Sequence, residues 1–493
     1  MRYNILIGGE AGQGPNILTQ IIGEALTENG NYVFYSRDYQ SLIRGGHNFN
    51  VLTFSEEPVW SNDSKIDILV CLDNKTEEMH KKDLKPGGII LKNSKKNMYY
   101  AGRIFKLLCL DFKLLEENLK KLKRNFDENI KNAKKGYGDE TKNICKVTKK
   151  NNKINFLNGN QGISEGAIQS DIGIYYAYPM TPATPILNEL ATKEDVKVVE
   201  LENEIAVINA AIGSSMVGKN VMVGTSGGGF DLMTETLSMT GMAEIPIVVY
   251  LSQRPGPGTG VATYTSQGDL NLAVNFGHGE FSRVVVTPGD PKEAQELTNQ
   301  AFHLSQKFKI PSIVLGDKHL AESFYTINEK PSFIKIKNET SLKRYNSYEK
   351  DSYGSATEDA KIIKSNVEKR LKKIELIKKE VEKFSKFSSY GKQNSKNIIL
   401  SWGSTKGAII DAIKSIDVEF IHLKYIEPFP KEIKKKILEK NIILVENSST
   451  GQLGGIVAKK IGILIDDKNK ILRYDGRPFF ADELNEEIKR RLK

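Results

Sequence analysis

Four short segments of this sequence carry residue types that could bind and transform a small molecule. They are YPMTPATP at residues 178–185, LENE at 201–204, TSGGGF at 225–230 and QRPGPGTG at 253–260. Each follows or borders a predicted strand of one sheet. Ligands of doubly wound sheets bind at the carboxyl ends of the strands, so we expect the four segments to come together at one site.

The proline-rich segment and the arginine segment could together orient a substrate. Prolines fix the backbone and remove N–H donors, so the hydroxyl of Thr181 is held on a stiff loop, although a rigid connection without function would have the same sequence. Arg254 stands among glycines and prolines, where it has little local structural purpose. Because a guanidinium can contact a carboxylate through two hydrogen bonds, Arg254 is a candidate for substrate binding.

Glu204 is the candidate acidic residue. It directly precedes an apolar helix predicted over residues 205–217, where the helix dipole favours a carboxylate, so helix capping is the alternative role. Thr225, Ser226 and Gly227 end a predicted strand and open the next helix, which exposes backbone donors to a ligand.

Two segments that resemble nucleotide-binding loops are better explained otherwise. Residues 213–220 (GSSMVGKN) nearly form a P-loop, but Asn220 replaces the hydroxyl residue that would bind magnesium, and a helix precedes the strand instead of following it. We therefore predict that Gly218 is a helix C-cap. GGEAGQG at residues 8–14 lacks the G-x-G-x-x-G spacing of a dinucleotide site, but a turn whose N–H groups bind a phosphate stays open.

The surrounding pattern predicts an α/β protein with three domains. Alternating strands and helices favour parallel-rich sheets, doubly wound in the second domain. The domains are placed at residues 1–112, 154–329 and 394–493, with charged helical linkers at 113–153 and 330–393. The predicted strands cover residues 3–9, 32–36, 48–54 and 67–72, then 197–201, 221–225, 246–251, 283–287 and 312–316, and finally 397–401, 418–422 and 441–446.

Composition argues against several classes of protein. The 493 residues are 39% hydrophobic and 27% charged, as in ordinary globular proteins, and no apolar run is long enough to cross a bilayer. The N-terminus enters a strand pattern without a signal segment, so a cytoplasmic protein is expected. Much of the net charge of +10 falls in the two linkers, which argues against nucleic-acid binding. Three widely spaced cysteines fit neither a disulfide framework nor a metal cluster.

In this order, the four segments resemble the α-type subunit of 2-oxoacid:ferredoxin oxidoreductases. GGEAGQG together with SLIRGGH at residues 41–47 looks like the γ-type domain that many members carry in front. VENSSTGQLGG (445–455) and YDGRPF (474–479) are similar to the transketolase-C-terminal-like domain of the family. The resemblance covers nearly the whole chain outside the linkers, and it implies that the middle domain binds the pyrimidine of thiamine diphosphate.

The resemblance also implies roles for individual residues. Glu204 would hydrogen-bond N1′ of the aminopyrimidine, so that the cofactor's own amino group can remove the thiazolium C2 proton. Thr181 and Arg254 would orient the carboxylate of the substrate. The other residues expected to contact the cofactor are Tyr178, Pro179, Thr225, Ser226 and Gly227. In the γ-type domain, the residues expected to help bind coenzyme A are Gly12, Gln13, Gly14 and Arg44.

The activity implied is conversion of a 2-oxoacid and coenzyme A to acyl-CoA and CO2, with electrons passing to ferredoxin. The sequence has no Gly-Asp-Gly followed by an Asn pair, the signature that binds Mg2+ and diphosphate in thiamine enzymes, and no cluster cysteines. A β-type partner subunit would supply the diphosphate site, Mg2+ and a [4Fe–4S] cluster, in a dimer of heterodimers, and this chain alone would be inactive. Met180 stands where the family usually has isoleucine, and Gly228 where it more often has proline.

Three alternatives stay open at this point. The fused layout resembles the group that uses 2-oxoglutarate, or a broad range of 2-oxoacids, but members that use pyruvate or branched-chain 2-oxoacids share every motif. A catalytically silent scaffold or regulatory paralogue would keep the fold, although the joint presence of Glu204, Thr181 and Arg254 argues against it. An NTPase or dinucleotide enzyme is the last alternative.

Overall fold

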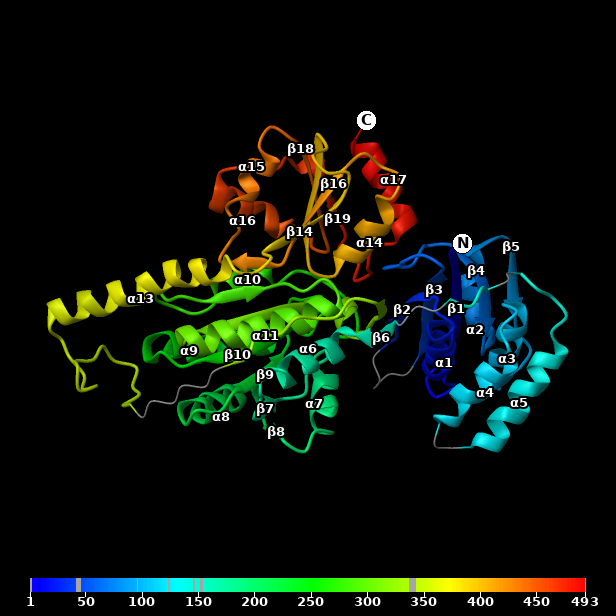
Figure 1. Ribbon diagram of the computed structural model, residues 1–493, viewed down its shortest axis with the longest axis horizontal. Helices are drawn as coiled ribbons and strands as arrows, with labels where there is room; N and C mark the ends of the chain where they lie inside the picture. Colours follow the sequence, from blue (N-terminus) through cyan, green and yellow to red (C-terminus); the bar gives the residue numbers. More distant parts are fainter. Residues whose placement is uncertain are drawn as a thin grey trace. The chain divides into compact units, whose positions relative to one another are not determined.

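The chain is described by a computed structural model that covers residues 2–40, 46–94, 96–122, 125–144, 147–150, 154–336 and 343–492. Backbone contacts divide it into two compact units. The first unit comprises residues 1–157, 322–329 and 480–486, and the second comprises 158–321, 330–479 and 487–493. Three β-sheets with flanking helices confirm the predicted α/β fold (Figure 1).

The first unit is built on a seven-stranded sheet in the order β5-β4-β1-β3-β2-β13-β6. Its strands are β1 (Arg2–Glu10), β2 (Tyr32–Asp38), β3 (His47–Ser55), β4 (Ile66–Cys71), β5 (Leu84–Leu91), β6 (Asn155–Asn158) and β13 (Phe324–Ile327). Its helices are α1 (Pro15–Glu28), α2 (Asn74–His80), η1 (Lys81–Asp83), α3 (Asn97–Leu107), α4 (Phe112–Lys120) and α5 (Phe126–Asp139).

This sheet is mixed, so the prediction of a parallel-rich first domain was only partly right. β1, β4 and β5 run parallel, but β3 pairs antiparallel with both β1 and β2, and β13 pairs antiparallel with β2. The physical reason is the length of the connection between β2 and β3, which is only residues 39–46. A parallel crossover needs about a dozen residues or more.

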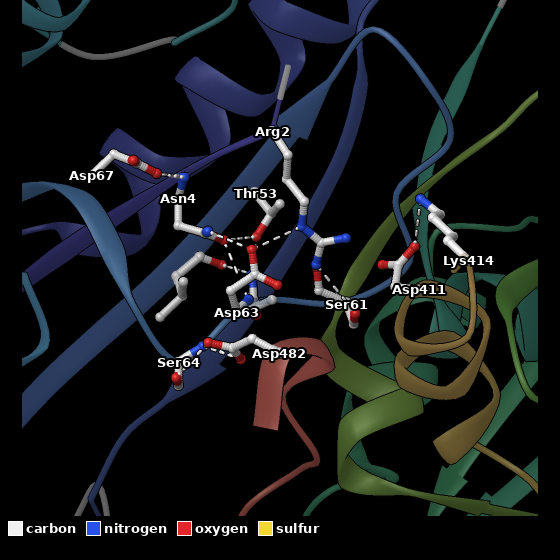
Figure 2. A network of polar contacts seen from close by, with 12 residues as sticks. Arg2, Asn4, Thr53, Ser61, Asp63, Ser64, Asp67, Asp411, Lys414 and Asp482 are labelled. Atoms are coloured by element: carbon white, nitrogen blue, oxygen red, sulfur yellow. Dashed lines mark hydrogen bonds and ion pairs between the residues drawn. The ribbon is translucent and has the colours of Figure 1, made fainter. Parts of the chain in front are cut away.

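Polar side chains anchor the start of β1 and the end of the chain to the same loop (Figure 2). The guanidinium of Arg2 donates to the carboxylate of Asp63 at 3.0 Å, and the side-chain amide of Asn4 donates to the same carboxylate at 3.1 Å. The neighbouring Ser64 donates to Asp482 through its backbone N–H at 2.8 Å and its hydroxyl at 2.6 Å. Residues 480–486 therefore belong to the first unit although they lie near the C-terminus.

The segment predicted as the first linker, residues 113–153, contributes helices that pack on the first unit. Leu115 and Ala133 are fully buried in its core. α5 approaches α3 so closely that a Cβ added at Gly102 would lie 2.0 Å from the carbonyl oxygen of Ala133, and one at Gly136 would lie 1.9 Å from a backbone oxygen of α3. The apolar stripe along this segment therefore covers the domain, and only its outer face is solvated.

The second unit contains two sheets, in the orders β17-β11-β12-β10-β9-β7-β8 and β14-β16-β15-β18-β19. The strands of the first of these are β7 (Ile174–Ala177), β8 (Lys197–Glu200), β9 (Val221–Thr225), β10 (Ile247–Gln253), β11 (Val284–Val286), β12 (Pro311–Asp317) and β17 (Tyr425–Glu427). Those of the other are β14 (Phe387–Gly391), β15 (Asn397–Trp402), β16 (Glu419–Leu423), β18 (Asn441–Glu446) and β19 (Lys470–Leu472).

The helices of this part of the chain are α6 (Gly159–Ile168), α7 (Thr184–Leu190), α8 (Glu204–Met216), α9 (Gly227–Ala243), α10 (Leu270–Asn275), α11 (Pro291–Phe308), α12 (Lys318–Glu322), α13 (Ala360–Val381), α14 (Thr405–Ala412), α15 (Ile433–Ile437), α16 (Gln452–Ile461), η2 (Asp467–Asn469) and α17 (Ala481–Arg491). Within the described residues, no helix combines the length and the apolar character that crossing a membrane requires.

The larger sheet of the second unit is doubly wound, as predicted. β7 to β12 run parallel, with α6, α7 and α11 in the core on one face and α8 and α9 in the core on the other. Successive residues of β9 alternate between these cores, with Met222 in one and Val221 and Val223 in the other. Because both faces are covered, these strands are apolar along nearly their whole length.

The segment at residues 213–220, which resembles a P-loop, contains the end of helix α8, as predicted. The backbone N–H of Gly218 donates to the carbonyl oxygen of Ser215 at 2.9 Å. Gly218 has a φ of 85° and directly follows the cap residue Val217, which is the position that glycine favours after a helix. β9 begins only at Val221, so the order is helix and then strand.

Two short strands that the sequence analysis did not predict pair with strands from other predicted domains. β13, at the end of the predicted middle domain, pairs with β2 in the first unit. β17, inside the predicted C-terminal domain, pairs antiparallel with β11 of the larger sheet. In addition, β14 begins at Phe387, inside the predicted second linker, and pairs with β16.

The tight contact between α3 and α5 can be tested with matched alanine substitutions. Gly102→Ala should lower the free energy of unfolding of the first unit by about 1–3 kcal/mol or more, because the methyl group meets the backbone of α5 and the helices must separate. Gly138→Ala in α5 is the control, because a Cβ there has nothing within 4 Å. It should leave stability unchanged or raise it by up to about 1 kcal/mol. Denaturant unfolding measures both, and equal effects would contradict the proposed contact.

Candidate active site

All four candidate segments leave the same edge of the larger sheet. They follow β7, β8, β9 and β10, which are neighbours in the order β10-β9-β7-β8 and run parallel. Their carboxyl ends therefore lie side by side, which is the edge where sheets of this kind bind ligands.

Glu204 opens helix α8 but does not cap it. The N-cap is Asn203, whose side-chain oxygen accepts a hydrogen bond from the N–H of Ala206 at 2.9 Å. Glu204 is 6% exposed, and within the described residues its carboxylate takes part in no hydrogen bond. Since the capping role is already filled by Asn203, the carboxylate of this largely buried residue is left for a ligand.

Helix α9 starts in close contact with two carboxylates. A Cβ added at Gly229 would lie 2.7 Å from Oε1 of Glu204, and one at Gly227 would lie 2.6 Å from Oδ2 of Asp269. With a larger residue at either position, the carboxylate beside it would have to shift. At Gly228 a Cβ would have nothing within 4 Å, so this position has room for a side chain.

Ser226 contributes a buried hydroxyl at the same place. It is the N-cap residue of α9, but its side chain makes no capping hydrogen bond. The Oγ atom is buried and has no hydrogen-bond partner in the part of the chain that the structure describes. A buried unpaired hydroxyl costs about 1–3 kcal/mol, so it is expected where a ligand supplies the missing partner.

Arg254 joins the arginine segment to the proline-rich segment. Its Nη1 donates to the backbone carbonyl oxygen of Thr181 at 2.9 Å, and its Nη2 lies 3.9 Å from the sulfur of Met180. Burial lowers the pKa of Arg254, while the negative charges of Asp269 and Glu204 raise it. The guanidinium is thus held by a carbonyl and attracted by two acidic groups, and it stays positively charged.

Asp269 is a site residue that sequence analysis missed. Its backbone N–H donates to Oε1 of Gln253 at 2.9 Å. Burial raises the pKa of its carboxyl to about 6, the charge of Asp231 raises it as well, and that of Arg254 lowers it. In the sequence, an aspartate before the apolar run LNLAV is an ordinary helix N-cap signal, which explains why it was not singled out.

The loop between Arg254 and Asp269 is anchored on the smaller sheet. Gln267 and Asn447 exchange hydrogen bonds, from the N–H of Gln267 to the Asn447 carbonyl at 2.7 Å and from the N–H of Asn447 to Oε1 of Gln267 at 2.8 Å. The guanidinium of Arg477 lies 3.8 Å from the ring centre of Tyr264. The C-terminal motifs at residues 445–455 and 474–479 therefore fix the loop that carries Arg254.

Of the remaining predicted residues, two lie at the start of the proline-rich segment and the others in the first unit. Tyr178 and Pro179 follow β7 and are exposed, with Tyr178 at 40%. Gly12, Gln13 and Gly14 form the turn between β1 and α1 in the first unit, where both glycines have positive φ and Gln13 accepts a hydrogen bond from the N–H of Glu10 at 2.9 Å. Arg44 lies outside the described residues.

Two protein-family models match the chain. The one described as "Pyruvate flavodoxin/ferredoxin oxidoreductase, thiamine diP-bdg" matches residues 165–392, which include all four segments of the site. The one described as "Pyruvate ferredoxin/flavodoxin oxidoreductase" matches residues 4–136.

Two relatives and one solved structure extend this similarity. The chain is 30% identical to the 2-oxoacid:ferredoxin oxidoreductase subunit alpha of Sulfolobus sp, over 99% of this chain and 96% of the relative. It is 31% identical to the 2-oxoglutarate synthase subunit KorA of Methanocaldococcus jannaschii, over 60% of this chain and 88% of the relative. The 2-oxoglutarate:ferredoxin oxidoreductase from Magnetococcus marinus, solved with 2-oxoglutarate, coenzyme A and succinyl-CoA bound, matches with a TM-score of 0.90 over 100% of both chains at 23% identity, and so shares its fold.

The raised pKa of Asp269 predicts a stability that depends on pH. Because the folded-state pKa is about 6 against an ordinary 3.8, this carboxyl favours folding below about pH 4, and the contribution is lost as the pH rises through 6. Asp269→Asn should therefore be more stable than the unchanged chain at pH 7.5, by roughly 1–3 kcal/mol, with a smaller advantage at pH 5. Thermal melting at several pH values measures this.

The control for this experiment is Asp195→Asn, on the exposed loop before β8. It should change stability by the same small amount at every pH. A stability difference for Asp269→Asn that does not vary between pH 5 and 7.5 would refute the shifted ionisation.

Proposed function

The chain belongs to the family of 2-oxoacid:ferredoxin oxidoreductase α subunits, and from this premise we propose that it forms the pyrimidine-binding half of a thiamine diphosphate site. The enzyme would convert a 2-oxoacid and coenzyme A to acyl-CoA and CO2 and pass electrons to ferredoxin. The observation that carries the proposal is Glu204, a buried carboxylate at a helix N-terminus with no hydrogen-bond partner among the described residues.

The residues around Glu204 fit an aminopyrimidine. Gly229 adds no side chain beside the carboxylate, where the hydroxyl of Thr225 also lies, and the unpaired hydroxyl of Ser226 offers a further hydrogen bond. When bound, thiamine diphosphate supplies a thiazolium carbon that attacks the 2-oxo carbon of the substrate. Glu204 would accept a hydrogen bond from the ring nitrogen and thereby hold a proton there, which is what activation of the cofactor requires.

Arg254 and Thr181 would position the substrate. The contact from Arg254 to the Thr181 carbonyl occupies Nη1 and leaves donors on Nη2 and Nε for a carboxylate. This contact also locks the two loops together, so the carboxylate that leaves as CO2 would be held in one orientation. Asp269 and Glu204, both close enough to influence the pKa of Arg254, would keep the guanidinium turned toward the same region.

Coenzyme A would contact the first unit. The turn at Gly12, Gln13 and Gly14 opens α1, a 14-residue helix whose N-terminus has no side-chain cap. Free N–H groups at a helix N-terminus attract phosphate, and coenzyme A carries several phosphates. The similarity to a coenzyme-A-bound 2-oxoglutarate:ferredoxin oxidoreductase supports this assignment, and it also supports 2-oxoglutarate as the substrate, alone or among a range of 2-oxoacids.

A second polypeptide would complete the enzyme. Both relatives are named as subunits, one of them as subunit alpha, which implies an assembly of several subunits. Among the described residues, no group of three or more His, Cys, Asp or Glu side chains is arranged to hold a metal ion. We assign the diphosphate site with its Mg2+, and the [4Fe–4S] cluster, to a β-type partner in a dimer of heterodimers.

The role of Glu204 is tested by removing its charge without changing its shape. After anoxic co-expression with the β-type partner, Glu204→Gln should lower coenzyme-A-dependent viologen reduction at least about 100-fold, because the amide cannot hold the proton at the ring nitrogen. The complex should still assemble in size-exclusion chromatography. Glu202→Gln, on an exposed neighbour, should keep normal activity. Turnover by Glu204→Gln close to that of this control would remove the proposed function.

The role of Arg254 predicts a change in KM. Arg254→Lys keeps the charge but loses the paired hydrogen bonds, so KM for the 2-oxoacid should rise roughly 10- to 100-fold while KM for coenzyme A stays unchanged. The same substitution at Arg490, an exposed residue of α17 that contacts Glu487, is the control. Equal effects on both Michaelis constants would speak against a contact with the substrate carboxylate.

Initial rates of the unchanged enzyme with a panel of 2-oxoacids identify the preferred substrate.

A further inference from the structure

A large basic cavity lies at the far end of α9 from the candidate active site. It has a volume of about 1,020 Å3 and is bounded by the end of α9, the segment 343–354 and the first half of α13. Figure 1 shows α13 as a long helix after this segment. α9 has 17 residues, so the cavity and the glycines near Glu204 are separated by about 25 Å along the helix. The family similarities and the proposed reaction assign no role to this cavity.

The cavity has an excess of positive charge. Its lining contains six cationic side chains and three carboxylates, an excess of three. The carboxylates are those of Glu244, Glu349 and Asp351. The cations are Lys343, Arg344, Lys350, Lys361, Lys369 and Arg370.

The three carboxylates are already occupied by other groups. Glu244 binds Lys373, which does not line the cavity, and lies 3.5 Å from Lys369. Glu349 forms a two-bond ion pair with Arg370. Asp351 accepts hydrogen bonds from two backbone N–H groups of its own turn, at 2.9 Å each. All three carboxylates therefore have hydrogen-bond or ion-pair partners other than Lys350.

Lys350 has no such partner. Its ammonium nitrogen is shielded from water and has no hydrogen-bond partner among the described residues. Burial lowers the pKa of Lys350, and the charges of Lys369 and Arg370 lower it further, against the attraction of Glu244 and Glu349. A buried cation without an acceptor is unfavourable unless another group supplies the negative charge.

The backbone around Lys350 is ordered by its own hydrogen bonds. Lys350 pairs with Ala356 in a β-bridge, and the side-chain amide of Asn366 in α13 donates to the Lys350 carbonyl at 2.9 Å. The side-chain amide of Asn346 donates to the carbonyl of Gly354 at 3.1 Å. The backbone that carries the Lys350 side chain is thus held by a structured turn.

We propose that this cavity binds a small phosphate-bearing anion, with Lys350 as the central donor and Lys343, Arg344, Lys361 and Lys369 around it. Phosphate fits because it presents several oxygens and more than one negative charge to clustered ammonium and guanidinium groups. The volume is large enough for a phosphorylated metabolite or a nucleotide as well as for inorganic pyrophosphate. The site is independent of the thiamine chemistry proposed above.

Calorimetric titration of the full-length chain with sodium pyrophosphate at constant ionic strength tests the proposal. The unchanged chain should bind one pyrophosphate in a saturable manner, and Lys350→Met should bind it at least tenfold more weakly. Lys372→Met is the matched control, since Lys372 is an exposed residue of α13 outside the cavity, and it should bind within twofold of the unchanged chain. Absence of saturable binding, or an equal loss in both variants, would overturn the proposal.

Thermal melting separates a ligand site from a structural role. Without anion, Lys350→Met should be as stable as the unchanged chain or more stable, because it removes an unpaired buried charge. Pyrophosphate should raise the Tm of the unchanged chain and of Lys372→Met but not that of Lys350→Met. A fall in the Tm of Lys350→Met without anion would show that Lys350 has a structural role and would overturn the proposal.

Parallel titrations with inorganic phosphate and ADP distinguish a free phosphate ligand from a nucleotide. Tighter binding of ADP would identify a nucleotide.

Discussion

The candidate active site depends on how closely the first turn of α9 approaches two acidic side chains. Glycines at 227 and 229 let the helix backbone lie against Asp269 and Glu204, whose carboxylates would have to shift to admit a side chain there. The N-cap residue of α9, Ser226, makes no capping hydrogen bond with its side chain, so the first N–H groups of the helix are left for a ligand. A helix N-terminus and a buried carboxylate stabilise each other electrostatically, so the arrangement keeps a charged acceptor in a mostly buried place.

The other side of the site depends on a loop whose supports come from distant parts of the sequence. Arg254 contacts the Thr181 carbonyl, while the loop that follows it is held through Gln267 by Asn447 and through Tyr264 by Arg477. The smaller sheet therefore contributes to the site without supplying a reacting group. This gives a structural reason for the polar motifs at residues 445–455 and 474–479.

Much of the fold and part of the site could be predicted from sequence because the signals are local. The apolar strands β9, β10 and β12 and the loops after them stand out, since a strand buried on both faces is hydrophobic throughout. The strand β13 and the strand β17 were missed because only three or four residues form each, and their partners lie far away in the chain. Asp269 was missed because its local pattern is that of a helix cap. Its burial and its closeness to Gly227 arise only when β9, β10 and the loop are assembled.

The strand β13 has a consequence for how the polypeptide can be divided. The chain enters the first unit three times, at residues 1–157, 322–329 and 480–486, and β13 lies between β2 and β6 in its sheet. A fragment ending at residue 157 would leave β6 without its neighbour and the edge of β2 open, and exposed strand edges promote aggregation. Residues 1–157 alone therefore do not contain the complete first unit. If residues 1–157 were encoded by a separate gene, another strand would have to take the place of β13 in the sheet. The fold of the first unit therefore depends on residues that lie far along the same polypeptide.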